Sequence, residues 1–189
     1  MVFKPSGNAN IEVKAWLKSP DQQSQLAREI AGSEPTILHQ RDTFFHASQG
    51  RLKLREINPD TPQATAQLIH YERDDDRTLR VSDYVISPVA EAPTMIAALD
   101  RAMGVRGVVE KKRLLWIVDQ TRIHFDSVIG LGNFVELEFV LRDGQSHAEG
   151  HEFAAELMSQ LDIDSKDVIE CAYIDLLEQA QQTNQNTSR

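Results

Sequence analysis

Charged and apolar residues alternate along most of this chain with a period of two. The clearest case runs from Thr121 to Leu141, where a glycine turn at Gly130 and Gly132 separates two alternating stretches. A period of two places successive side chains on opposite faces of a β-strand. The segment therefore predicts a hairpin in which each strand has one apolar face, which must be buried, and one charged face.

The same alternation predicts further strands at residues 10–17, 36–46, 51–57, 66–73, 79–86 and 105–118. Helical spacing and capping residues predict four helices: between Pro20 and Gly32, after Pro88 as far as Gly104, after a capping box at Ser146 and Glu149, and from Ser165. The order of these elements predicts an α+β fold with an antiparallel sheet. We expect one domain over residues 1–178 and a polar, disordered tail over residues 179–189.

Composition narrows the class of protein. The 189 residues carry a net charge of −9, which argues against a general nucleic-acid partner. No apolar run approaches the roughly 20 residues of a membrane span, so no membrane association is expected. A single cysteine, Cys171, cannot form an internal disulfide, and the first residues lack the apolar centre of a signal peptide. We therefore expect a cytoplasmic protein.

The charged faces of the predicted strands raise a question about the sheet. Nine of the 20 basic residues lie in strands whose alternate positions are largely apolar: Lys14, Arg51, Lys53, Arg55, Arg73, Arg80, Lys111, Arg113 and Arg122. Four acids, Glu12, Asp126, Glu136 and Glu138, lie in the same register. For any one strand, a solvated charged face is the more usual interpretation. The bases concentrate on several strands and the acids on the strands either side of the glycine turn. This sorting favours instead a sheet that curls around a charged cavity.

Such a cavity has an implied occupant. Enclosed lysines and arginines repel one another unless a polyanion lies between them, and arginine matches phosphate oxygens well. Carboxylates are the ligands that Mg²⁺ and Mn²⁺ prefer. A triphosphate bound together with a divalent ion would satisfy both groups of residues.

Six segments carry a resemblance to a known family: IEVKAWL, DTFFHASQGRLKLRE, LIHYER, RVSDY, EKKRLLWIV and TRIHFDSVIGLGNFVELE. They resemble the CYTH domain, whose members are also called triphosphate tunnel metalloenzymes, over about residues 10–177. The resemblance implies an eight-stranded antiparallel β-barrel, or tunnel, with helices packed on its outside. It also implies a triphosphate and one or two Mg²⁺ or Mn²⁺ ions as cofactors inside.

The resemblance also implies roles for individual residues. The family's first-strand motif, Glu-x-Glu-x-Lys, falls on Asn10, Glu12 and Lys14, so an amide replaces the first carboxylate and leaves the number of metals open. The implied metal ligands are Glu12, Asp126, Glu136 and Glu138. The implied phosphate ligands are Lys14, Lys53, Arg55, Arg73, Arg80, Lys111, Arg113 and Arg122, of which Lys14, Arg55 and Arg122 are also expected to act in catalysis.

The reaction itself stays open at this point. We favour a triphosphatase acting on tripolyphosphate, a nucleoside triphosphate or thiamine triphosphate, because hydrolysis needs only the shared phosphate clamp. The alternatives are a class IV adenylate cyclase, which converts ATP to cyclic AMP and pyrophosphate, and a module that binds a polyphosphate without turnover. His124 shares the face of Arg122 and Asp126, and either a functional contact or a structural hydrogen bond fits it. The helices could also support a homodimer.

Overall fold

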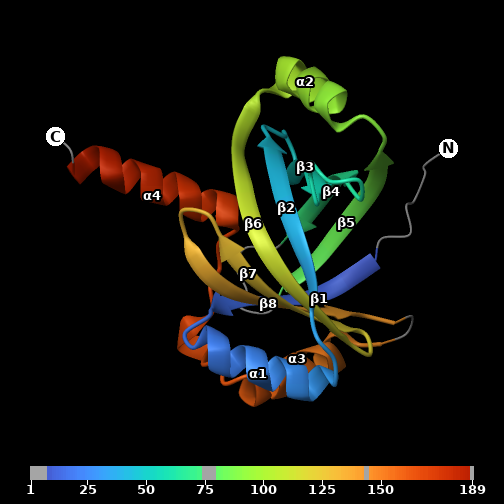
Figure 1. The fold of residues 1–189 in the computed structure, drawn as a ribbon, viewed down its shortest axis with the longest axis vertical. Coiled ribbons are helices and arrows are strands. Elements are labelled where there is room, and N and C mark those ends of the chain that lie inside the picture. Colours follow the sequence, from blue (N-terminus) through green and yellow to red (C-terminus); the bar gives the residue numbers. More distant parts are fainter. Residues whose placement is uncertain (1–7, 74–79, 143–144, 188–189) are drawn as a thin grey trace.

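The chain forms a closed antiparallel barrel of eight strands in the order β1-β5-β4-β3-β2-β6-β7-β8 (Figure 1). The computed structural model describes residues 8–73, 80–142 and 145–187. The strands are β1 (Asn8–Trp16), β2 (Thr36–Phe45), β3 (Arg51–Ile57), β4 (Thr65–Arg73), β5 (Arg80–Val89), β6 (Val105–Val118), β7 (Thr121–Val128) and β8 (Gly132–Val140). Strand β1 pairs with both β5 and β8, which closes the sheet and confirms the predicted fold class.

Four α-helices lie outside this barrel (Figure 1): α1 (Pro20–Ala31), α2 (Ala92–Met103), α3 (His147–Gln160) and α4 (Tyr173–Thr187). Helices α1 and α3 lie together under the part of the barrel formed by β1, β7 and β8, whereas α2 lies at the opposite end. The predicted capping box begins α3, because the Ser146 hydroxyl accepts the Glu149 N–H and the Glu149 carboxylate accepts the Ser146 N–H. Among the described residues, none of the helices has both the length and the apolar character needed to span a membrane.

The main hydrophobic core lies between the barrel wall and helices α1 and α3. The outward-facing alternate residues of β1, β7 and β8, such as Ile11, Ile123 and Leu137, pack there against Ala27 and Leu157 of the helices. Burying each large aliphatic side chain contributes about 1.5–3 kcal/mol to folding. Since the apolar faces of these strands point outward to the helices, their charged faces point into the barrel.

A second core fills part of the barrel interior. Here Tyr173 and Ile174, at the start of α4, pack against the strand residues Phe44, Val109 and Phe134. Outside the barrel, α4 is held by two arginines of the wall. Arg106 and Arg51 both form ion pairs with Asp175, at 2.6 and 3.1 Å.

Two predicted helix starts are wrong. Pro88 does not precede a helix but continues β5, opposite Gln67 of β4, because the fixed φ of proline also suits a strand; α2 begins only at Ala92. Ser165 begins a short 3-10 turn (Ser165–Asp167), and the chain then becomes extended because Val168 bridges to Ala15 of β1. Helix α4 therefore begins at Tyr173, and it stays helical to Thr187, where we expected disorder from residue 179 onward.

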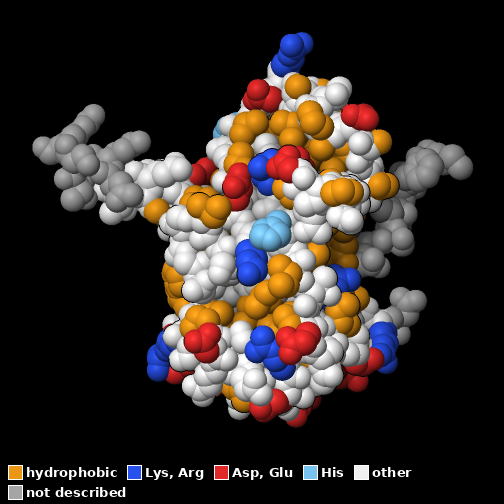
Figure 2. Space-filling model, in the orientation of Figure 1, with side chains coloured by type: hydrophobic (Ala, Val, Ile, Leu, Met, Phe, Trp, Pro, Cys, Tyr) orange, Lys and Arg blue, Asp and Glu red, His pale blue; other side chains and the backbone are white. Residues whose placement is uncertain are grey.

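The face of the molecule shown in Figure 2 does not display acidic and basic side chains sorted into separate areas. Figure 2 shows one face of the molecule, with uncharged side chains over much of the barrel wall and acidic and basic side chains scattered among them. The buried charged residues include Lys14, Lys111 and Arg113, all on inward-facing positions. The interpretation of these strands as having a solvated charged face is therefore wrong for this barrel.

Candidate active site

The barrel encloses a cavity of about 310 Å³ with a strongly charged wall. Ten charged residues of the described chain line it: the bases Lys14, Lys53, Arg55, Lys111, Arg113 and Arg122, and the acids Glu12, Asp42, Glu136 and Glu138. The volume is at the lower end of the range usual for small-molecule sites. On the β4 and β5 side the wall is apolar and aromatic, formed by Ile69, Tyr71, Tyr84 and Ile86.

Strand register brings five of these residues together around β8. Glu136 lies opposite Lys14 of β1 on one side and opposite His124 of β7 on the other. Two residues along, Glu138 lies opposite Glu12 of β1 and Arg122 of β7. The acids therefore form one patch of the wall, with a base, a histidine or another acid beside each.

Glu136 is the most heavily paired acid of this patch. Its Oε2 accepts a hydrogen bond from Arg113 Nη2 at 2.6 Å, and its Oε1 lies 3.5 Å from Lys14 Nζ. Burial opposes ionisation of the carboxyl, but the positive charges of Lys14 and Arg113 outweigh it and hold the pKa of Glu136 well below its ordinary value. Glu136 is therefore an anion at neutral pH.

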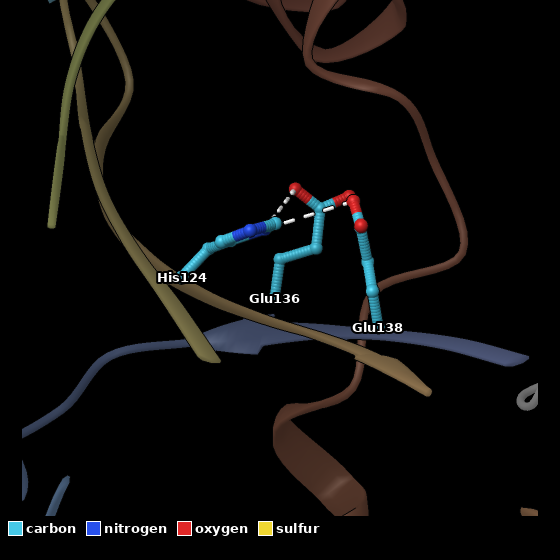
Figure 3. A group of neighbouring side chains, drawn as sticks. All are labelled: His124, Glu136 and Glu138. Carbon is cyan, nitrogen blue, oxygen red and sulfur yellow. Dashed lines mark ion pairs between the residues drawn. The ribbon is translucent and has the colours of Figure 1, made fainter. Parts of the chain in front are cut away.

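His124 completes this patch (Figure 3). Its Nδ1 lies 3.6 Å from Oε1 of Glu138 and 4.0 Å from Oε2 of Glu136, and the three side chains point toward one another. Burial first, and then the positive charge of Arg113, lowers the pKa of His124 to about 4, so its ring is neutral at pH 7. Ligand atoms of these three residues lie within 4.8 Å of one another, a spacing at which they could hold a metal ion.

A second charged group is centred on Asp126, which contacts three residues that line the cavity. Arg113 donates to both oxygens of Asp126 at 2.6 Å, Lys111 Nζ donates at 3.1 Å, and the Tyr173 hydroxyl donates at 3.0 Å. The side chain of Asp126 has no exposed surface. Burial raises the pKa of Asp126, but the positive charges of Arg113 and Lys111 have the larger effect and hold this pKa well below its ordinary value. In this arrangement Asp126 is the counter-ion of two cavity bases.

A third group joins β2 to β3 and contains a residue that sequence reasoning missed. Asp42 of β2 lies opposite Arg55 in the strand register and accepts two hydrogen bonds from its guanidinium, both at 2.7 Å. Lys53 Nζ donates to the same carboxylate at 2.9 Å. Burial and then the charge of Arg55 lower the pKa of Lys53 to about 7. Asp42 is identified by the strand register, which sets it opposite Arg55.

Comparison with protein families identifies the chain. A model of the CYTH domain matches residues 8–173. The chain belongs to the CYTH family. The predicted resemblance is thereby confirmed, over almost the same residues.

Solved structures show how widely this CYTH fold is shared. The PH1012 protein of Pyrococcus horikoshii matches with a TM-score of 0.76 at 23% identity, over 89% of this chain and 99% of that one. A candidate adenylate cyclase from Vibrio parahaemolyticus matches with a TM-score of 0.73 at 20% identity, over 92% of this chain and 99% of that one. An adenylyl cyclase candidate from Hippeastrum, described as having a dominant triphosphatase activity, has a TM-score of 0.63 at 12% identity, over 90% and 95% of the two chains. A comparison with curated proteins found no match.

The remaining predicted site residues of this CYTH chain lie as follows. Arg122 is on the cavity wall, with 45% of its side chain exposed, and pairs with Glu138 at 3.2 Å. Glu12 is on the wall, 3.8 Å from Lys14 Nζ. Arg73 and Arg80 belong to β4 and β5, but their side chains, like that of Asn10, lie outside the described residues.

The residues of the acid patch fit the divalent ion that the family implies. Glu12, Glu136 and Glu138 supply carboxylate oxygens, the hard ligands of such ions. Nδ1 of His124 is buried and has no hydrogen-bond partner among the described residues. A buried polar atom that lacks a partner is unusual, and an ion in this patch would provide one.

Proposed function

We propose that this CYTH protein is a metal-dependent triphosphatase, which cleaves the terminal phosphate of a triphosphate held inside its barrel. The observation that supports this most strongly is the convergence of six bases with an acid patch in one cavity of about 310 Å³. A polyanion would neutralise the bases, and a divalent ion would neutralise the acids. Hydrolysis requires nothing further of the wall.

The bases would bind the phosphates from two strands that flank β2 in the barrel. Lys53 and Arg55 belong to β3, whereas Lys111 and Arg113 belong to β6, and each pair already has a carboxylate that fixes it. Held guanidinium groups match phosphate oxygens with two parallel hydrogen bonds. Because Asp42 and Asp126 hold these side chains in place, little side-chain entropy would be lost when a triphosphate binds.

The acid patch would orient the attacking water. A divalent ion, when bound there, supplies charge neutralisation and lowers the pKa of its water. Burial raises the pKa of the Glu138 carboxyl, but neighbouring positive charges, Arg113 and Arg122 among them, hold this pKa below its ordinary value, so Glu138 is ionised. It can therefore accept a hydrogen bond from a water aimed at the terminal phosphorus. Arg122, beside Glu138, would stabilise the charge that develops on the phosphate oxygens.

Adenylate cyclase activity is the second candidate, and one feature favours it. The β4 and β5 side of the cavity presents Tyr71, Tyr84, Ile69 and Ile86, which could pack against a nucleoside. In that reaction the ribose 3′-oxygen attacks the α-phosphorus and pyrophosphate leaves. The names of the solved neighbours include both activities, with triphosphatase activity dominant in the Hippeastrum protein.

One assay separates the candidates. The protein is incubated with tripolyphosphate, ATP or thiamine triphosphate and Mg²⁺ or Mn²⁺, and orthophosphate, pyrophosphate and cyclic AMP are quantified. We expect orthophosphate. Equal amounts of pyrophosphate and cyclic AMP from ATP would replace the proposal with a cyclase, and binding without any product would replace it with a binding module.

The site is tested by one substitution and its matched control. Glu136→Gln removes one of the three negative charges of the acid patch while keeping the shape of the side chain, and we expect turnover to fall by a factor of roughly 10³ or more. Glu152→Gln makes the same chemical change at an exposed position on α3 and should have no effect. Full turnover in Glu136→Gln, with the control also active, would contradict the assigned site.

A further inference from the structure

No hydrogen bond to Nδ1 from the described residues explains the place of His124 in the acid patch. It lies on β7 directly opposite Glu136 of β8, and only 3% of the residue is exposed. Its Nδ1 has no hydrogen-bond partner in the part of the chain that the structure describes. The nearest carboxylate oxygens, on Glu138 and Glu136, lie 3.6 and 4.0 Å away, too far for hydrogen bonds.

The same distances suit atoms that share a metal ion. Two ligand atoms that each lie about 2.1 Å from an ion are separated by roughly 3 to 4.2 Å, depending on the angle between them. The separations of 3.6 and 4.0 Å fall within this range. Dashed lines in Figure 3 join the His124 ring to both carboxylates, which come from alternate positions on β8.

The neighbouring bases leave room for such an ion. Arg113 donates to Oε2 of Glu136, but a carboxylate oxygen has two lone pairs, so one remains. Lys14 lies on the other side of the carboxylate, 3.5 Å from Oε1. The recorded contacts of His124 Nδ1 are with the carboxylates of Glu136 and Glu138, and not with either base.

We propose that Nδ1 of His124 is a nitrogen ligand of the divalent ion held by Glu136 and Glu138, and that it makes the site select a first-row transition ion over Mg²⁺. Mg²⁺ takes oxygen ligands almost exclusively, whereas imidazole suits transition ions. An all-carboxylate patch would have no such preference. This proposal rests on the metal site of the proposed function, but it concerns which ion is bound and through which atom.

Pulsed electron paramagnetic resonance of the Mn²⁺-loaded protein tests the contact without any assay of turnover. We expect a ¹⁴N coupling from a bound imidazole in the wild type, which changes to a ¹⁵N coupling when the protein is made with ¹⁵N-histidine. It should vanish in His124→Phe, which keeps a planar ring, and persist in His39→Gln, a histidine change at an exposed position of β2. Mn²⁺ bound to the wild type without a nitrogen coupling would overturn the inference and leave the carboxylate site standing.

Ion affinities test the selectivity. We expect the wild type to bind Mn²⁺ at least about tenfold more tightly than Mg²⁺, and His124→Phe to weaken Mn²⁺ about 10- to 100-fold while changing Mg²⁺ little. Equal losses for the two ions, or a nitrogen coupling that survives in His124→Phe, would overturn it. Because the wild-type spectrum decides the contact, a variant that fails to fold does not remove the test. Wild-type protein that binds neither ion would overturn this inference together with the proposed metal site.

Discussion

Asp42 and Arg55 form a two-point contact across the β2–β3 hairpin, with Nε to Oδ1 and Nη2 to Oδ2 distances of 2.7 Å each. Lys53 donates to the same carboxylate, so one acid serves two bases of the cavity wall. In the protein without substrate, Asp42 is the counter-ion of both bases and holds them in place. A bound triphosphate would supply further negative charge to the same two groups.

This arrangement predicts an unusual response to Asp42→Asn. Breaking a buried ion pair by removing one partner costs about 3–5 kcal/mol, so the free energy of unfolding should fall by roughly 3 kcal/mol. Tripolyphosphate should then stabilise the variant more than the wild type, because its oxygens replace the missing charge. The measurement is the melting temperature with and without tripolyphosphate. Asp60→Asn, an exposed carboxylate near Arg41, is the control. An equal ligand-induced shift in variant and wild type would count against this role of Asp42.

The lowered pKa of Lys53 predicts a pH-dependent affinity. Asp42 on β2, Arg55 on β3 and Lys111 on β6 act on its charge, and the ring of Tyr71 on β4 lies 5.5 Å away. With a pKa of about 7, Lys53 loses its proton in the free protein as the pH rises through neutrality. A triphosphate favours the charged form, so binding takes up a proton and weakens as the pH rises.

The expected size follows from one proton. The dissociation constant of tripolyphosphate should rise by up to about tenfold per unit above pH 8, because one pKa unit corresponds to one factor of ten. Isothermal titration calorimetry at roughly pH 7, 8 and 9 measures the dissociation constant at each pH. Lys53→Arg keeps its charge over this range and should flatten the profile. A wild-type affinity that is constant from neutral to alkaline pH would show that Lys53 is not the group that titrates.

Most of the fold could be predicted because the alternation of polar and apolar residues is local. This alternation predicts all eight strands, and the alternating faces of β7 and β8 indicate which side chains share a surface. It could not give the start of α4, because Val168 is held extended by a bridge to Ala15, about 150 residues earlier along the chain. Tertiary pairing of this kind overrides the local preference of the segment.

The site divides in the same way. The bases of β3 and β6 were found because they repeat within a strand, but Asp42 is a single acid in a largely uncharged strand. Only the register of the β2–β3 hairpin sets it opposite Arg55. Similarly, the sequence predicts Asp126 as a metal ligand together with the acids of β8. Its contacts with Arg113 and Lys111 are set by the register of β6 and β7, which the sequence does not show.

The two interpretations of Asp126 predict different results for Asp126→Asn. As the buried counter-ion of Lys111 and Arg113, its loss should lower the free energy of unfolding by about 3–5 kcal/mol at pH 7. The pKa of Asp126 is lowered in the folded protein, so this contribution is present above about pH 4 and is lost as the pH falls below it. The difference between variant and wild type should therefore shrink in acid, which urea denaturation at pH 7 and at acidic pH can measure. Full stability with lost Mn²⁺ binding would instead make Asp126 a metal ligand, as the family resemblance implies.

Tyr173 connects α4 to the site, and two substitutions separate its contributions. Its hydroxyl donates to Asp126 at 3.0 Å, and its ring lies 4.1 Å from Lys14 Nζ and 5.0 Å from Lys111 Nζ. Tyr173→Phe removes only the hydroxyl, so we expect a loss of about 1–3 kcal/mol in the free energy of unfolding with little change in KM.

Tyr173→Ala also removes the ring from over both lysines and from the second core, where it packs against Phe134 with ring centroids 4.9 Å apart. We expect it to destabilise the protein by about 3–5 kcal/mol, and to raise the KM for tripolyphosphate because Lys14 and Lys111 lose the surface that holds their ammonium groups. Urea denaturation and steady-state kinetics of both variants supply the comparison. If Tyr173→Phe raised KM as much as Tyr173→Ala, the hydroxyl rather than the ring would hold the lysines, and the contact would act through Asp126.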